Sequence, residues 1–219
     1  MTTFGTVPAR RLGGLHVLTD ARGGQRALEA VAAAVAAGAP VVQVRAKECT
    51  DRELYDFAAA VVAICLPARV TCLVNDRVDV ALAVGAAGTH LGATDLPVAA
   101  ARRVAGPDHL IGGTAREPER ARQLVAEGAD YLGVGPAWPT TTKTGLPAAL
   151  GPAGLRAVAE AVDVPVVAIG GVTAERVPEL LAAGAAGVAV VGAIAAAADP
   201  GAATRKLLRA LAGASGGNR

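Results

Sequence analysis

The chain has 219 residues, of which 53% are hydrophobic, and its formal net charge at pH 7 is +2. This length and hydrophobic content are sufficient to bury a large core, and they fit a single α/β barrel domain. Aromatic residues make up only 2% of the sequence and the basic residues form no stripe, so a nucleic-acid partner is not expected.

The two ends of the chain are expected to lie outside the folded domain. Residues 1–14 lack the apolar segment of a secretory signal, and residues 213–219 are small or polar. We therefore expect an N-terminal tail over 1–14, one barrel domain over 15–212 and a disordered C-terminal tail over 213–219. The cysteines are odd in number and lack metal-ligand spacing, which is typical of reduced thiols in a cytoplasmic protein.

Apolar runs with β character alternate with Ala-rich helical runs that tend to end near a glycine. Strands are predicted over residues 15–19, 41–45, 70–75, 88–92, 109–114, 131–135, 165–171 and 187–192. The uncharged segment 180–198 is rich in Ala and Gly, which favours a helix followed by a strand over a membrane span, so no membrane partner is expected. This alternation predicts a single-domain TIM (β/α)8 barrel, although a doubly wound open sheet would show a similar pattern.

The second predicted strand ends in long polar side chains. Gln43, Arg45 and Lys47 alternate with Val44 and Ala46, so one face of the strand end carries all three polar groups. Because an unpaired buried cation is costly, this face requires an anionic or polar partner. The alternative is a strand end in solvent that carries a surface salt bridge.

Two carboxylates follow neighbouring predicted strands. Asn75 and Asp76 end the third strand, a short helix is expected over residues 78–84, and Asp95 follows the fourth strand. Adjacent strands lie about 4.8 Å apart, so one cation can span the two carboxylates. Magnesium prefers one or two carboxylates together with water and substrate phosphate oxygens. The alternative is that these residues only cap the helices that follow them.

A long loop follows the sixth predicted strand, from residue 135 to residue 151. Loops of this length in compact domains are usually functional or disordered. Trp138 can cover an aromatic ring from this loop. Side chains suited to binding an anion follow it, namely Thr140, Thr141, Thr142 and Lys143.

Three other strand ends offer close backbone approach. The fifth strand ends in two glycines and Thr114, which adds one hydroxyl. Gly170 and Gly171 follow the seventh strand and Gly192 follows the eighth, where backbone N–H groups and a helix N-terminus commonly hold a phosphate in barrels. The alternative is that these glycines serve tight turns only.

Five separated segments occur in the order in which they are found in one enzyme family: QVRAK, NDRVDVALAVGAAGTHLGATD, GPAWPTTTKTG, AIGGV and AVVGAI. Together they resemble the thiamine-phosphate synthases, and they extend over most of residues 15–194. The resemblance implies a TIM barrel that joins hydroxymethylpyrimidine diphosphate to a thiazole phosphate, forming thiamine phosphate and releasing diphosphate.

The resemblance also implies roles for individual residues. Catalytic roles are implied for Arg45, Lys47, Thr114 and Lys143, and Mg2+ ligands for Asp76 and Asp95. Substrate contacts are implied for Gln43, Val44, Arg45, Ala46, Lys47, Asn75, Thr114, Thr140, Thr141, Thr142, Lys143, Gly171, Val191 and Gly192. The chain departs from the family pattern at Ala46, where Glu is expected, and at Thr114 and Gly192, where Ser is common. None of these departures removes an essential charge.

The implied chemistry needs no nucleophilic side chain. Loss of diphosphate would leave a pyrimidine cation that the thiazole nitrogen captures, while Mg2+, Arg45, Lys47 and Lys143 stabilise charge on the leaving group.

Two other functions remain open from the sequence. A thiazole tautomerase of the same fold would need a general base such as His after the fifth strand, where Ala115 and Arg116 stand, and His90 is expected to be packed or hydrogen-bonded instead. A non-catalytic barrel that binds a phosphorylated metabolite would have no need for Asp76 and Asp95. Assembly into a homo-oligomer is also left open.

Overall fold

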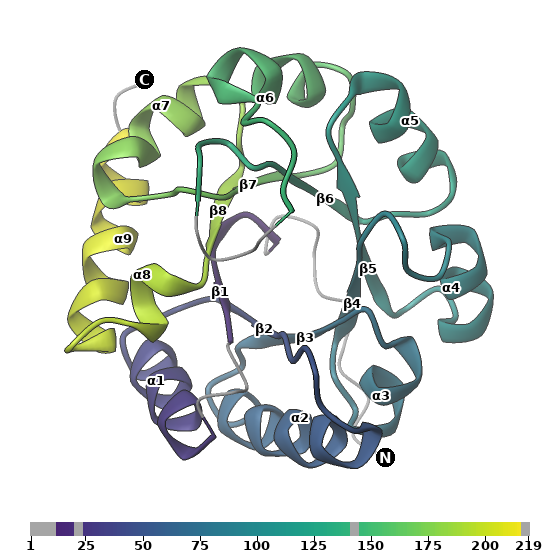
Figure 1. The fold of residues 1–219 in the computed structure, drawn as a ribbon, viewed down its shortest axis with the longest axis vertical. Helices are drawn as coiled ribbons and strands as arrows, with labels where there is room; N and C mark the ends of the chain where they lie inside the picture. Colours follow the sequence, from purple (N-terminus) through teal and green to yellow (C-terminus); the bar gives the residue numbers. More distant parts are fainter. Residues whose placement is uncertain (1–11, 20–23, 141–144, 216–219) are drawn as a thin grey trace.

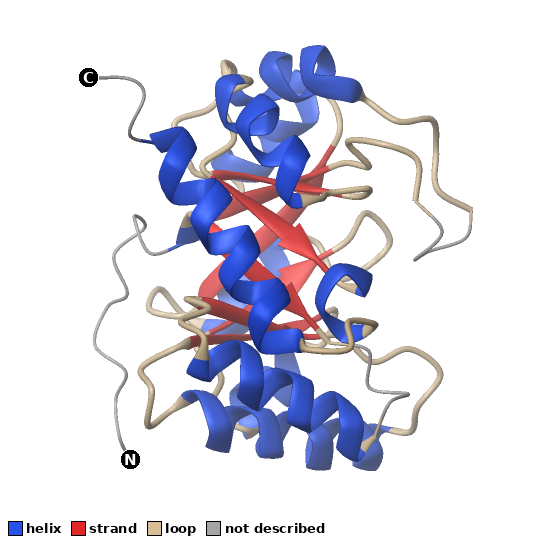
Figure 2. Cartoon of the chain, turned by 90° about the vertical axis from the view of Figure 1, so that its left-hand side faces the viewer, coloured by secondary structure: helices blue, strands red, loops and turns tan. Residues whose placement is uncertain are grey.

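The computed structural model describes residues 12–19, 24–140 and 145–215. Within them, parallel strands form a closed barrel in the order β1 to β8, and β8 pairs with β1 (Figure 1). The prediction of a single-domain TIM barrel is confirmed, and the open sheet is wrong. Helices surround the strands on all sides in the end-on view, and Figure 2 shows them packed outside the barrel wall.

The strands match the predicted runs to within a few residues. They are β1 (Gly14–Leu18), β2 (Val41–Val44), β3 (Thr71–Asn75), β4 (Gly88–Leu91), β5 (Leu110–Ala115), β6 (Tyr131–Val134), β7 (Val166–Ile169) and β8 (Gly187–Val190). Most of their residues are buried, because a parallel sheet wrapped by helices has no solvent face.

The helices follow the strands one by one. They are α1 (Gln25–Ala36), α2 (Asp51–Cys65), α3 (Val78–Ala83), α4 (Val98–Ala105), α5 (Pro118–Ala126), α6 (Gly151–Ala159), the 3-10 turn η3 (Ala174–Arg176), α7 (Val177–Ala182), α8 (Gly192–Ala195) and α9 (Pro200–Ser215). The segment 180–198 is thus the end of α7, β8 and α8, as expected. None of the helices in the described ranges has the length and apolar character needed to cross a bilayer.

Helix α2 illustrates how the sequence determines a boundary. The Thr50 hydroxyl accepts a hydrogen bond from the N–H of Glu53, and the Glu53 carboxylate accepts one from the N–H of Thr50. This reciprocal pair begins the helix directly after the loop that follows β2.

The ends of the domain differ slightly from the expected limits. Strand β1 begins at Gly14 and α9 continues to Ser215, so the ordered elements extend beyond 15–212. The rest of the two expected tails, residues 1–11 and 216–219, lies outside the described residues.

Apolar side chains fill much of the barrel interior. This interior cluster consists of Leu12, Leu18, Val41, Leu73, Leu110, Tyr131, Val167 and Ala189. The Tyr131 ring lies directly over Gly112, where any Cβ atom would collide with it. The barrel interior is therefore closed below Tyr131.

Candidate active site

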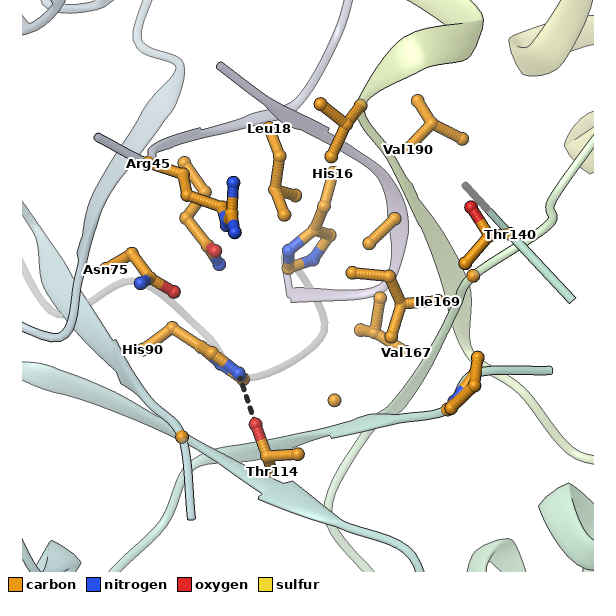
Figure 3. A pocket seen from close by; sticks show the side chains of 18 of the residues that line it. His16, Leu18, Arg45, Asn75, His90, Thr114, Thr140, Val167, Ile169 and Val190 are labelled. Atoms are coloured by element: carbon orange, nitrogen blue, oxygen red, sulfur yellow. Dashed lines mark hydrogen bonds between the residues drawn. The ribbon is translucent and has the colours of Figure 1, made fainter. Parts of the chain in front are cut away.

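A cavity of about 310 Å³ lies at the C-terminal ends of the strands, where barrel enzymes place their active sites. Figure 3 shows Arg45, Asn75, His90 and Thr114 extending into it from neighbouring strands. The cavity is lined by eleven of the predicted site residues: Gln43, Arg45, Lys47, Asn75, Asp76, Asp95, Thr114, Thr140, Gly171, Val191 and Gly192.

Two predicted substrate-binding residues do not reach the cavity. Val44 is fully buried against Val31 and Leu54, between the strand and the helices, and Ala46 packs on the same cluster. The reason is the alternation of side chains along β2, which turns these two residues outward while Gln43 faces inward. A substrate contact at these two positions therefore stays a prediction, and it would have to be made through the backbone.

Part of the predicted β6–α6 loop site cannot be placed. Thr141, Thr142 and Lys143 lie outside the described residues, whereas Thr140 lines the cavity. Trp138 does not line the cavity, and the guanidinium carbon of Arg176 lies 4.8 Å from the centre of its ring. The proposed role of Trp138 as a cover for an aromatic ligand is not supported.

The two carboxylates predicted to share a cation face the same cavity. Asp76 has a positive φ of 67° and its N–H donates to the carbonyl of His90 at 2.8 Å, which holds it beside β4. The carboxylate of Asp95 accepts a hydrogen bond from the N–H of Gly92 at 2.7 Å. Burial, together with a hydrogen bond to the Asp76 carboxyl group, raises the pKa of Asp95 above its ordinary value. The site therefore disfavours a second negative charge beside Asp76.

The capping alternative for these carboxylates is wrong. The N-cap positions of α3 and α4 are Arg77 and Pro97, and neither helix has a side-chain cap hydrogen bond. Asp76 and Asp95 are thus free of a helix-capping role.

Lysine and arginine side chains lie beside the acidic pair. The ammonium group of Lys47 forms an ion pair with the carboxylate of Asp76. Arg45 also lines the cavity, and its N–H donates to the Thr19 hydroxyl at 2.9 Å, which holds the end of β2 against β1. The salt bridge foreseen for this strand end exists, with Lys47 partly exposed, and both of its side chains line the cavity.

The donor set suits a hard divalent cation. Two carboxylates face each other, and the amide of Asn75 lies on the same wall. In the described part of the chain, no group of three His, Cys, Asp or Glu side chains is arranged to hold a metal. A cation at this pair would therefore complete its shell with water and ligand oxygens, as Mg2+ commonly does.

On the opposite side of the cavity, the backbone of the segments after β7 and β8 forms the wall. Gly170 and Gly171 follow β7 with φ values of 93° and 64°, and Val191 and Gly192 begin α8 after β8. A Cβ atom at Gly171 would lie 2.7 Å from the Cβ of Trp138, so only glycine fits here. This side can present N–H groups to an anion.

Three polar side chains form the cavity floor, and the sequence analysis had singled out only His90 among them. His16, His90 and Tyr131 all line the cavity, and the ring centres of the two histidines lie 5.4 and 5.5 Å from that of Tyr131. Burial lowers the pKa of both His16 and His90 to about 4 and raises that of Tyr131. The missed signal is alternation: His16 lies between the outward-facing Leu15 and Val17.

The position expected to carry a base in a tautomerase holds none. Ala115 is buried, and Arg116 donates to the carbonyl groups of Gly135 and Ala148 at 2.7 and 2.8 Å. Arg116 is therefore occupied with holding the loop after β6. His90 is hydrogen-bonded, as predicted.

Comparisons with known proteins agree with these features. A family model described as thiamine monophosphate synthase matches residues 15–194. The thiamine-phosphate synthase of Salinispora tropica is 59% identical over 203 residues, which cover 91% of this chain and 98% of that protein. The thiamine-phosphate synthase of Moorella thermoacetica is 42% identical over 200 residues, covering 91% and 95%.

A solved structure leads to the same family. The thiamine phosphate pyrophosphorylase from Pyrococcus furiosus superposes with a TM-score of 0.85 at 36% identity, covering 94% of this chain and 98% of that one. The expectation of an enzyme, rather than a non-catalytic barrel, is confirmed by these relatives, which are synthases and a pyrophosphorylase. The chain therefore belongs to the thiamine monophosphate synthase family and is an enzyme of that family.

Proposed function

We propose that the protein joins hydroxymethylpyrimidine diphosphate to a thiazole phosphate, giving thiamine phosphate and diphosphate. The observation that supports this most is that one cavity brings together two carboxylates with a lysine on one side and glycine-rich backbone on the other. Asp76, Asp95 and Lys47 suit a metal-bound diphosphate, and the backbone at Gly171 and Gly192 suits a monophosphate.

The diphosphate side would activate the leaving group. Asp76 and Asp95 would hold Mg2+, which when bound supplies positive charge to the departing diphosphate. Arg45 and Lys47 would bind its oxygens directly, joined by Lys143 from the loop after β6. Asn75 and Gln43 would orient the pyrimidine.

The monophosphate side would hold the second reactant. Gly171, Val191 and Gly192 would bind the thiazole phosphate through backbone N–H groups, with hydroxyls from Thr140, Thr141 and Thr142. The bond between the pyrimidine methylene carbon and the diphosphate oxygen breaks, and the thiazole nitrogen lone pair then forms the new bond to that carbon. The contribution of the chain is orientation and charge stabilisation.

The test is a turnover assay with purified protein, both proposed substrates, and either Mg2+ or a chelator. We expect diphosphate release only when both substrates and Mg2+ are present, with thiamine phosphate formed in equal amount. Release at an unchanged rate in the chelator would contradict the metal role, and no thiamine phosphate under any condition would contradict the proposed reaction.

A further inference from the structure

A chain of hydrogen bonds crosses the cavity floor and ends at Thr114. The amide nitrogen of Gln43 lies 3.5 Å from the Tyr131 hydroxyl, which lies 3.0 Å from Nδ1 of His90. The other ring nitrogen of His90, Nε2, lies 3.0 Å from Oγ1 of Thr114, the contact drawn in Figure 3. The four residues come from β2, β6, β4 and β5, so the chain links strands from different parts of the barrel.

The direction of each bond follows from what the groups can donate. The Gln43 amide nitrogen can only donate, so the Tyr131 oxygen accepts. Tyr131 is 1% exposed, and its own hydroxyl hydrogen also needs an acceptor. Among the described residues the remaining partner is Nδ1 of His90, which must therefore carry no hydrogen.

The donors and acceptors in the rest of the hydrogen-bond chain then have one consistent assignment. A neutral His90 has a single ring hydrogen, which lies on Nε2 and is donated to Oγ1 of Thr114. Thr114 accepts this bond, so its own hydroxyl hydrogen stays available to the cavity that it lines. If the ring hydrogen of His90 lay on Nδ1 instead, the phenol hydrogen of Tyr131 would be buried without a partner, which costs free energy.

We infer that Tyr131 and His90 are positioning residues that turn the hydroxyl hydrogen of Thr114 toward the cavity, where it donates to an oxygen of the diphosphate. This inference rests on the proposed function for the identity of the ligand. Diphosphate oxygens are acceptors, so a hydroxyl with its lone pairs facing them would repel them and one with its hydrogen facing them binds. The Ser-to-Thr departure at position 114 keeps the hydroxyl that this arrangement uses.

The hydrogen order can be observed directly in the free protein. In 15N-histidine NMR spectra near pH 7.5, the ring nitrogens report which one carries the hydrogen. The chain has three histidines, and His16 serves as a reference because its Nε2 donates to the carbonyl of Leu12 at 2.8 Å. We expect His90 to carry its hydrogen on Nε2, and a hydrogen on Nδ1 overturns the inference.

A double-mutant cycle tests whether Tyr131 acts through Thr114. The measurement is the affinity for inorganic diphosphate with Mg2+, by calorimetry. Thr114→Val should weaken binding about 10-fold to 100-fold, while Thr114→Ser should stay close to the starting protein. Tyr131→Phe should weaken binding by about 2-fold to 10-fold alone, and by nothing further when Thr114→Val is already present. An equal loss in both backgrounds overturns the inference.

The barrel also contains a matched control. Thr89 and His109 form a similar hydrogen bond of 2.9 Å, but Thr89 points from β4 toward the helices and neither residue lines the cavity. Thr89→Val should leave diphosphate affinity unchanged, and a loss equal to that of Thr114→Val overturns the assignment. Failure of the starting protein to bind Mg2+ and diphosphate would contradict the proposed function, while the NMR result would still decide the hydrogen order.

Discussion

The ammonium group of Lys47 lies against the carboxylate of Asp76, and Asp76 and Asp95 line the same cavity. Lys47 therefore supplies positive charge at the point where the proposed cation would sit. Its side chain is 48% exposed, whereas that of Asp76 is 20% exposed, so the lysine is the partner that is free to move. The ion pair marks a site that requires a cation whether or not a metal is bound.

Removing this lysine should improve binding of a bare metal ion. In Lys47→Met we expect Mn2+ or Mg2+ alone to bind about fivefold more tightly, because a partly exposed ion pair contributes about 1 kcal/mol and the metal no longer competes with it. Affinity for diphosphate should fall in the same variant. Calorimetry with the metal alone and then with diphosphate makes both measurements.

Lys206→Met is the control for this prediction. Lys206 forms an exposed ion pair with Glu175, at 2.7 Å, away from the cavity lining. Its removal should change neither affinity. Weaker metal binding in Lys47→Met would contradict competition between the ammonium group and the metal.

Neutralising Asp95 should separate activity from stability. In Asp95→Asn we expect turnover to fall by about 100-fold or more, because one proposed metal ligand is lost. The melting temperature should stay the same or rise, since burial and the neighbouring Asp76 already disfavour the charge. Turnover assays and thermal unfolding test this, with Asp163→Asn as the control at an exposed residue between α6 and β7. A large loss of stability in Asp95→Asn would point to a structural role.

A methyl group at Gly171 should damage the proposed monophosphate side. Gly171→Ala adds a Cβ against Trp138 and the carbonyl of Pro139 at a positive φ of 64°, so we expect destabilisation by about 2 kcal/mol or more and weaker binding of the thiazole phosphate. Gly145 has a similar φ of 68° but open space around it. Gly145→Ala should therefore cost only about 1 kcal/mol. Equal effects of the two changes on stability and binding would show that the contact with Trp138 has no importance.

Stability should decrease as His16 becomes protonated. Its pKa is about 4 in the folded protein, below the ordinary value of 6.5, so the unfolded chain binds the proton more readily. The contribution of His16 to the free energy of unfolding should be fully present above pH 6.5 and should be lost as the pH falls from 6.5 to 4. The expected loss is roughly 3 kcal/mol. Denaturant unfolding at several pH values measures the slope. The ring of His16 faces Tyr131 and His90, and His16→Gln should make the slope shallower while leaving the contribution of His90. An unchanged slope would contradict the assignment to His16.

The sequence predicted the barrel and most of the cavity wall because both follow from local patterns. Apolar runs and glycine punctuation locate the strands, and polar residues at strand ends such as Asp76 and Arg45 must face the C-terminal side of a barrel. Alternation also shows that the Val44 side chain faces outward, although the family resemblance implied a substrate contact at this residue. Alternation also turns His16 inward, but its contact with Tyr131 depends on the packing of β1 near β6 across the interior, which no local pattern encodes.

The stacking of Tyr131 on Gly112 closes the barrel below the cavity. A small molecule that binds in the cavity must therefore enter and leave at the C-terminal ends of the strands.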